Sequence, residues 1–390
     1  MNVLVIQLRR VGDVLMTTPA LRALKSRFPQ AEITYVCERP FSPVLRANAD
    51  VDTLLPLEAG AGLKERLRLA ATLRERGFDL ALDFEGSGVS AALTAASAAT
   101  RRVGYRGRVR AAAYTDRVDA EPLRRGSLAA EKLALLAPLG IDPRTVGARP
   151  TLAVDARARE WVARSLEAAG VTSATFLLTV APWARSSEAA WPLERFAGLL
   201  DLLAGSFELE TVLLLRAGDD PLAERLGRLT RVPLFQLSTP PSLLQLAALL
   251  DRADLHVGNE NAPRHMAAAL GTATLTLYAP GARRRWSSPG DPLQPGLEPD
   301  VDGATRPASA ALGTGSGPAS PATAEAGPAI SRIAAEAAFE AVLALKAYLP
   351  RLGAARRTAV ADVPAAGPES PHPGTAEESP TASHSGRGAA

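Results

Sequence analysis

The strongest constraint on the fold is a regular alternation of short apolar runs with longer amphipathic segments through residues 1–290. Runs such as Asn2–Gln7 and Glu32–Cys37 are rich in apolar and β-branched residues, which is typical of parallel strands buried on both faces. Segments between them, such as Leu63–Arg76, place apolar residues at helical spacing. The alternation therefore predicts an α/β protein whose parallel sheets are covered by helices.

The alternation forms two arrays, and between them, at about 101–151, the pattern loosens. Two such arrays predict doubly wound Rossmann-like domains at 1–150 and 151–290, facing each other across a cleft, with ligands beyond the carboxyl ends of the strands. The first array predicts strands at Asn2–Gln7, Glu32–Cys37, Val51–Leu57 and Phe78–Phe84, and helices at Met16–Phe28, Ser42–Ala47, Leu63–Arg76 and Ser87–Ala98. The second predicts strands at Thr175–Ala181, Glu210–Leu215, Leu234–Leu237, Asp254–Gly258 and Thr274–Tyr278, and helices at Ala156–Ala169, Leu193–Leu203, Pro221–Leu229, Ser242–Arg252 and Pro263–Leu270.

The composition changes towards the C-terminus, where residues 301–328 are almost entirely Ala, Gly, Pro, Ser and Thr. Such a stretch buries too little apolar surface to order itself. We therefore expect a disordered linker at 291–330, an amphipathic helix packing on the core at 331–350, and a disordered tail at 351–390. The apolar face expected for that helix, Ser331–Leu349, consists of Phe339, Val342, Leu343 and Leu349.

Composition also excludes several classes of site. Cys37 is the only cysteine, so a disulfide framework or a cysteine-rich metal site is excluded. The four histidines all lie at or after position 256 and lack paired metal-ligand spacing, so no metal is expected. The formal net charge of +3 is too small to indicate that the protein binds nucleic acid. No apolar run approaches the ~18–20 residues of a membrane span. The N-terminal apolar run, Val3–Ile6, is too short for an export signal, and basic residues follow it instead of preceding it, so we expect a soluble cytoplasmic protein.

Gly86–Ala91 matches the pattern G-x-G-x-x-A between a strand and a helix, which can bind a dinucleotide pyrophosphate. This motif leaves open a nicotinamide-dependent oxidoreductase. A tight turn is favoured, because the first strand-to-helix turn lacks the motif's glycines and Arg106 and Arg108 stand where an acidic residue is expected.

Asp13 lies where the first strand gives way to a helix, within the stretch Arg9-Arg10-Val11-Gly12-Asp13. A helix N-terminus favours the ionised form of a carboxyl group, and such a carboxylate suits a general base that activates a hydroxyl nucleophile. The alternative is an Asp that only caps the helix.

The stretch His256–His265 also runs from a strand into a helix, with Pro263 at the first helical turn. Backbone N–H groups at that start could receive a phosphate, and His265 could donate to a ligand oxygen or hydrogen-bond within the helix–sheet interface. The densest basic run is Arg101, Arg102, Arg106, Arg108 and Arg110. It could contact substrate phosphates or an anionic membrane, or form a solvated loop.

Three stretches together resemble the bacterial heptosyltransferase family, glycosyltransferase family nine. The opening VLVIQLRRVGDVLMTTPALRALKSRFPQAEITYV is similar to the N-terminal signature of that family. WPLERFAGLLDLL, from Trp191 to Leu203, and the later VGNENAPRHMAAALGTATLTLYAP resemble a helix start and the donor loop of the family.

The resemblance implies a GT-B architecture, with the acceptor side at 1–150 and the nucleotide-sugar side at 151–290. It implies inverting, metal-independent transfer of a heptose from an ADP donor to the lipopolysaccharide inner core, without a cofactor. It assigns Asp13 as the catalytic base. The donor is assigned to Arg185, Ser186, Asp219, Glu260, Asn261, Ala262 and His265, and the acceptor to Arg9, Arg10, Gly12, Arg101 and Arg102. Within the donor set, Asp219 or its neighbour Asp220 is expected near the nucleotide ribose.

A lipid-linked acceptor further implies peripheral contact with the cytoplasmic face of the inner membrane, for which the 101–110 run with Arg124 and Arg125 offers positive charge. The chain departs from the family pattern at three positions: Ala189 replaces a Lys, Glu260 an Asp and Ala262 a Gly. Those departures keep open a catalytically impaired relative that binds sugar nucleotide or acts as a scaffold.

Overall fold

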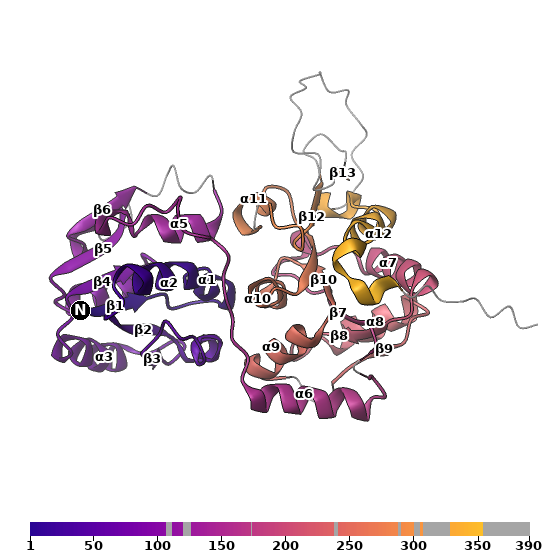
Figure 1. Cartoon of the computed structure of the whole chain (residues 1–390), viewed down its shortest axis with the longest axis horizontal. Coiled ribbons are helices and arrows are strands. Elements are labelled where there is room, and N and C mark those ends of the chain that lie inside the picture. The colour runs from indigo at the N-terminus through magenta and orange to yellow at the C-terminus, as the bar shows by residue number, and fades with distance from the viewer. Residues whose placement is uncertain are drawn as a thin grey trace, which may run out of the picture. The chain divides into compact units, whose positions relative to one another are not determined.

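The first half of the chain forms a parallel sheet with β1 at its centre, as Figure 1 shows. The computed structural model describes residues 1–106, 111–119, 126–172, 174–237, 241–287, 290–299, 305–306 and 328–353. Within them, the first sheet has the order β3-β2-β1-β4-β5-β6. Its strands are β1 Asn2–Ile6, β2 Glu32–Glu38, β3 Thr53–Leu57, β4 Leu80–Asp83, β5 Arg101–Arg106 and β6 Asp116–Asp119. The helices of this half are α1 Val11–Leu15, α2 Thr18–Arg27, α3 Leu63–Glu75, α4 Gly88–Ala96 and α5 Leu128–Ala134, with 3-10 turns η1 Arg39–Leu45, η2 Ala111–Ala113 and η4 Ala137–Leu139.

Alternate residues of β1 point to opposite faces of this sheet, and each face has its own helices. Val3 and Val5 pack in the apolar cluster that contains residues of α1, α2 and α5. Leu4 and Ile6 pack in a second cluster with residues of α3 and α4. Both faces of the central strand are therefore covered, which is why it reads as one apolar run.

Two expectations for this half need correction. The helix expected at Met16–Phe28 is α2, and a separate short helix that was not expected, α1, precedes it and ends before the turn at Met16–Thr17. The loosened stretch 101–151 contains β5, β6 and α5. In β5 only Val103–Tyr105 are buried while arginines occupy both ends, so its apolar signal is short.

The second half repeats the architecture with the strand order β13-β12-β11-β10-β7-β8-β9 in the described residues. Its strands are β7 Leu177–Ala181, β8 Glu210–Leu213, β9 Leu234–Phe235, β10 Leu255–Asn259, β11 Ala273–Leu277, β12 Gly296–Pro299 and β13 Thr305–Arg306, the last antiparallel to β12. Its helices are α6 Ala156–Ala168, α7 Leu193–Ser206, α8 Asp220–Leu229, α9 Leu243–Arg252, α10 Ala262–Leu270, α11 Ala282–Trp286 and α12 Ala335–Ala344, with 3-10 turns η5 Ser187–Ala189, η6 Ala329–Arg332, η7 Lys346–Tyr348 and η8 Pro350–Gly353. The expected α/β class with two doubly wound sheets is confirmed.

The expected linker begins later than residue 291. Strand β12 pairs with β11, and Leu297 is buried in the core, so the second domain extends to at least residue 299. Most of the remaining linker and nearly all of the expected tail, 300–304, 307–327 and 354–390, lie outside the described residues.

The C-terminal helix is interrupted, contrary to the expectation of one helix at 331–349. Helix α12 lies between η6 and η7, and its Val342 is fully buried. Leu349 is buried as expected, whereas Phe339 and Leu343 are half-buried against the same cluster. The indole Nε1 of Trp191 donates to the carbonyl oxygen of Ile333 at 2.8 Å. This segment therefore completes the core of the second half.

The two halves share a continuous interior within the compact unit Met1–Arg356. One apolar cluster joins α1 and α2 of the first half to α6, α9 and α10 of the second. Helix α1 contacts α10, and at the closest point the backbone of Gly12 lies under the ring of His265. A Cβ atom at position 12 would approach His265 Cδ2 to 2.7 Å, so this approach requires glycine.

Candidate active site

Asp13 lies in the first turn of α1, directly beyond the carboxyl end of β1. Arg10 caps this helix with its backbone and without a side-chain hydrogen bond, so the alternative of Asp13 as the N-cap is wrong. The side chain of Asp13 is half-buried and borders a cavity of about 250 Å³. That cavity takes its walls from both halves: Arg10, Val11, Gly12, Asp13, Phe41, Trp183, Arg185, Arg216, Glu260, Asn261, Ala262, His265 and Trp286. The structure thus brings the carboxylate and the predicted donor loop together.

Asn261 fixes the donor loop from within. Its side-chain oxygen accepts from the N–H of Arg264 at 3.2 Å, which caps α10. Its amide nitrogen donates to the carbonyl oxygens of Ala181 at 3.1 Å and Trp183 at 3.0 Å, at the end of β7. The side chain of Asn261 is therefore used inside the protein, and its role is to hold the loop.

These contacts also revise the phosphate cradle expected at the start of α10. Pro263 has no N–H group, and the N–H of Arg264 is bonded to Asn261. The first turn thus offers at most the N–H of Ala262 to an anion. The cations on the cavity wall, Arg10, Arg185 and Arg216, supply the remaining positive charge.

Glu260, His265 and Arg264 form a hydrogen-bonded chain, of which Glu260 and His265 line the cavity. Arg264 Nη1 lies 3.2 Å from His265 Nδ1 and can only donate, so that ring nitrogen accepts. The ring proton is then on Nε2, which donates to Glu260 Oε1 at 2.7 Å. Burial lowers the pKa of His265 despite the opposing effect of Glu260. A neutral imidazole therefore faces Asp13 at neutral pH.

Glu260 is ionised in this arrangement. Burial acts to raise its pKa, but the hydrogen bond from His265 and the charges of Arg185 and Arg264 lower it overall. Arg185 Nη2 lies 3.5 Å from the other carboxylate oxygen. The glutamate thus presents a negative charge at the cavity, held between a histidine and an arginine.

Arg216 is a cavity residue that the sequence did not single out. Its guanidinium stacks on the ring of Trp183 at 4.7 Å. Asp219 accepts from Arg216 Nε at 2.9 Å and Nη2 at 3.0 Å, and from its backbone N–H. Asp219, predicted to lie near the ribose, is absent from the cavity wall and positions Arg216 there.

Lys132 is the second residue that sequence reasoning missed. It lies on α5 with its side chain buried, and its ammonium group donates to Gln7 Oε1 at 2.8 Å and to the carbonyl oxygen of Phe84. It borders a further cavity of about 270 Å³ that also reaches Asp13. Burial lowers the pKa of Lys132 to about 8, opposed first by Asp13. The sequence signal was a pair of charges, Glu131 and Lys132, inside the apolar stretch 128–139.

The pKa of Asp13 depends on its burial and on nearby positive charges. Burial raises the pKa of its carboxyl group, and the positive charge of Lys132 is the first of several that oppose the rise. A raised pKa makes the carboxylate a stronger base. The arrangement therefore gives a basic carboxylate at the wall of a positively charged cavity.

An ion pair joins the two halves next to this site. Arg285 of α11 places Nη1 2.5 Å from Oε2 of Glu131, and the carboxylate is almost fully buried. Glu131 precedes Lys132 on α5. The pair thus connects the second half to the helix that supplies the buried ammonium group.

The sequence of this chain matches the model of one known protein family. The model of glycosyltransferase family 9 (heptosyltransferase) matches residues 66–296, more than half of the chain. The chain belongs to glycosyltransferase family 9. The predicted family membership is confirmed.

Individual family 9 proteins are similar over most of their length. Lipopolysaccharide heptosyltransferase 3 of Escherichia coli is 26% identical over 277 residues, covering 68% of this chain and 80% of the relative. Lipopolysaccharide heptosyltransferase 2 of Salmonella typhimurium is 29% identical over 299 residues, covering 72% and 84%. These relatives are distant.

Solved structures confirm the expected GT-B fold of this family 9 chain. The E. coli ADP-heptose lps heptosyltransferase II superposes with a TM-score of 0.69 at 21% identity, covering 89% of this chain and 99% of that one. The family 9 glycosyl transferase from Veillonella parvula gives 0.75 at 18% identity, covering 89% and 97%.

Some residues assigned from the family 9 resemblance do not reach the site. Arg101 and Arg102 open β5, and Arg101 pairs with Leu80 at the start of β4. The starts of parallel strands lie at the sheet edge opposite their ends, so both arginines are remote from Asp13. Arg101 forms an ion pair with Asp116, and Arg102 donates to carbonyl oxygens of neighbouring turns.

Other assigned residues have mixed outcomes. Ser186 is exposed and lines no part of the cavity that contains Glu260. Arg9 borders the second cavity beside Asp13, where it forms an ion pair with Glu85. Arg108, Arg110, Arg124 and Arg125 lie outside the described residues.

The Gly86–Ala91 segment is a tight turn whose donors are used internally. The N–H groups of Glu85 and Gly86 donate to Asp83 Oδ1 at 3.0 and 2.8 Å. Ser87 and Ser90 form a reciprocal capping box at the start of α4. These donors are therefore bonded within the protein, and the segment offers no support for the oxidoreductase alternative.

In the described part of the chain, no helix is long and apolar enough to cross a membrane. The same residues contain no group of three or more His, Cys, Asp or Glu side chains placed to hold a metal ion.

Proposed function

We propose that this chain is an inverting, metal-independent glycosyltransferase that moves a heptose-like sugar from an ADP donor to a glycan of the lipopolysaccharide inner core or a related acceptor. The observation that carries the proposal is one cavity lined by Asp13 of the first half and by Glu260 and His265 of the second. Family membership supports the sugar and the donor. One solved relative is an E. coli heptosyltransferase with ADP-2-deoxy-2-fluoro heptose. The reaction would take place at the cytoplasmic face of the inner membrane, where a lipid-linked acceptor is accessible.

The proposed reaction is a single displacement. Asp13 takes the proton of an acceptor hydroxyl while the oxygen of that hydroxyl forms a bond to the anomeric carbon of the donor sugar. The bond from that carbon to the diphosphate breaks on the opposite face, and ADP leaves with the electron pair. The carboxylate of Glu260 stabilises the positive charge that develops on the sugar. The guanidinium groups of Arg185 and Arg216 receive the charge of the departing diphosphate.

Titration calorimetry with ADP-, UDP- and GDP-linked sugars tests the donor. We expect ADP-heptose to bind most tightly, followed by transfer to a lipopolysaccharide acceptor. Tight donor binding without transfer or hydrolysis would support the impaired relative, for which Ala189, Glu260 and Ala262 are the supporting departures. Preference for another nucleotide overturns the ADP assignment.

Arg216→Ala is expected to weaken donor binding roughly 10- to 150-fold, because a charge-assisted hydrogen bond to phosphate contributes about 1.5–3 kcal/mol. Calorimetry measures the change. Arg228→Ala is the matched control, since Arg228 is an exposed residue of α8 paired with Glu224. Equal affinities of the two variants contradict a phosphate contact by Arg216.

Lys132→Met is expected to move the acidic limb of the pH profile of kcat/KM to higher pH. The charge of Lys132 lowers the pKa of Asp13, and the base acts in its ionised form. Removing that charge raises the pKa of Asp13 further, so a higher pH is needed to ionise it. The exposed Lys346→Met serves as the control. An unmoved acidic limb excludes Lys132 as the residue that adjusts the base.

A further inference from the structure

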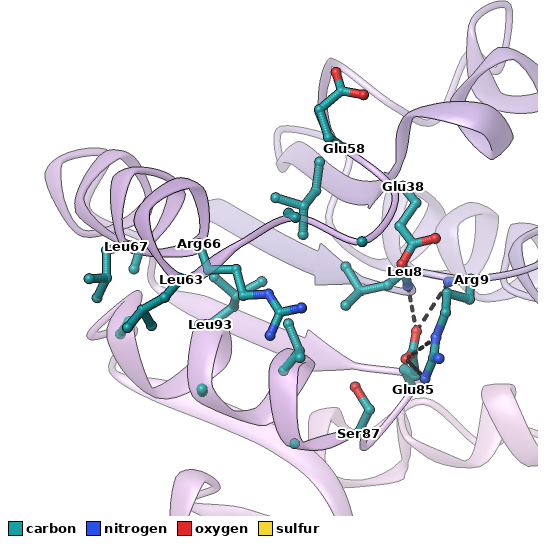
Figure 2. Close-up of a pocket in the computed structure, with 18 residues that line it drawn as sticks. Leu8, Arg9, Glu38, Glu58, Leu63, Arg66, Leu67, Glu85, Ser87 and Leu93 are labelled. Carbon is teal, nitrogen blue, oxygen red and sulfur yellow. Dashed lines mark hydrogen bonds and ion pairs between the residues drawn. The ribbon is translucent and has the colours of Figure 1, made fainter.

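A groove of about 810 Å³ runs between α3 and α4 in the first half. Figure 2 shows Leu63 and Leu67 on one helix, Leu93 on its neighbour, and Arg66 reaching into the space between them. Leu8, which follows β1, and Leu57 at the end of β3 also line it. The volume falls within the ~300–1,000 Å³ of small-molecule sites. The groove is therefore large enough for a ligand, and its lining is mostly apolar.

The groove is open because one wall is made of small residues. Gly88, Ala92 and Ala96 recur every four residues along α4 and line the groove. Opposite them, Leu63 is 73% and Leu67 is 60% exposed, one helical turn apart on α3. Adjacent exposed leucines beside an apolar groove indicate an interaction surface. The wall residues suit an unbranched aliphatic chain.

The rim of the groove connects it to Asp13. Arg9 and Glu85 line the groove and also the 270 Å³ cavity that Asp13 borders. Arg66 and Glu38 add a further donor and a further acceptor at the rim, and Arg66 Nε is enclosed without a hydrogen-bond partner among the described residues. Mixed donors and acceptors of this kind suit the hydroxyl groups of a sugar. A ligand can therefore extend from the apolar groove across a polar rim to the base.

We propose that the groove between α3 and α4 binds an aliphatic chain of a glycolipid acceptor, whose sugar part crosses the Arg9–Glu85 rim toward Asp13. The proposal rests on the transferase function proposed above and assigns a binding site to the lipid part of its acceptor. The committed occupant is a single alkyl chain attached to a sugar. A second copy of this chain is the competing occupant.

Alkyl glucosides below their micelle concentration provide the probe. We expect affinity, measured by calorimetry, to rise about fourfold for each methylene added between octyl and decyl glucoside, since each buried methylene contributes the same apolar transfer energy. Methyl glucoside should bind far more weakly. An affinity that does not depend on chain length overturns the proposal.

Ala92→Trp should fill the groove and weaken decyl glucoside binding roughly tenfold or more. Ala95→Trp is the matched control, because Ala95 is exposed on the same helix but does not line the groove. Leu67→Gln, at an exposed wall position, should weaken binding without a folding defect, as checked by circular dichroism. Equal binding by Ala92→Trp and Ala95→Trp overturns the assignment.

Two further measurements distinguish binding of the acceptor in the groove from the alternative interpretations. Decyl glucoside should raise the KM of a lipid-linked acceptor without changing that of the donor, and an unchanged acceptor KM overturns the acceptor assignment. A wild-type dimer that Ala92→Trp dissociates, detected by sedimentation, assigns the groove to a second copy instead. If the wild-type protein binds alkyl glucosides with an affinity that rises with chain length but transfers no sugar, the proposed transferase function is contradicted. If it transfers sugar but its glucoside affinity does not depend on chain length, only the assignment of the groove is contradicted.

Discussion

Asp13→Asn is expected to lower kcat for sugar transfer by about 10²–10⁴-fold, the usual contribution of a general base. The amide has nearly the shape of the carboxylate but cannot accept the hydroxyl proton. Asp13 is half-buried and borders both cavities, so the change removes the reacting group without disturbing the core. Transfer of radiolabelled sugar under single-turnover conditions measures the effect.

Binding of the donor provides the control for this variant. ADP-heptose should bind to Asp13→Asn with nearly the wild-type affinity, because the arginines on the cavity wall are unchanged. Glu58→Asn, an exposed carboxylate at the far rim of the groove, should retain transfer to an acceptor without a lipid chain. Wild-type turnover by Asp13→Asn would remove this carboxylate from the mechanism.

Gly12→Val is expected to reduce kcat/KM about 10²-fold while the domains remain folded, because misplacing reacting groups by about 1 Å can cost that much. A Cβ at Gly12 would lie 2.7 Å from His265 Cδ2. The ring cannot turn aside easily, since Glu260 and Arg264 hold its two nitrogens. The added side chain therefore separates α1 from α10 and enlarges the distance between Asp13 and the donor loop.

Gly205→Val is the matched control, because a Cβ at that helical glycine meets no atom within 4 Å. Thermal unfolding distinguishes a local shift from a folding defect. We expect Gly12→Val to unfold cooperatively and to lose transfer, while Gly205→Val retains transfer. Equal activity of the two variants would show that the contact between α1 and α10 does not position the reacting groups.

Much of the fold could be predicted from local pattern, because buried parallel strands leave a continuous apolar signal. The placement of Asp13 also followed, since a residue just after the first strand must lie at the carboxyl edge of the sheet. Strand β5 escaped detection because its buried part is only Val103–Tyr105. The short helix α1 and the interruptions around α12 depend on packing that periodicity does not report.

The electrostatic part of the site was less accessible to sequence reasoning. Lys132 and Arg285 lie far apart in the chain and meet the site because α5 contacts α2 and because Trp286 of α11 packs against His265 of α10. Arg101 and Arg102 were assigned to the acceptor from the sequence, which did not show which end of their strand faces the cleft. Asp219 and Asn261 were placed in the right region, but their hydrogen bonds serve protein groups.

Arg10, which caps α1, has a backbone φ of 67°, a conformation that residues other than glycine rarely adopt. Holding a residue in such a conformation costs about 1–3 kcal/mol. Laboratory selection for heat resistance alone would consequently favour Arg10→Gly, which relaxes the turn and removes a cation from the 250 Å³ cavity beside Asp13. In the proposed mechanism, thermal tolerance and turnover therefore oppose each other at this residue.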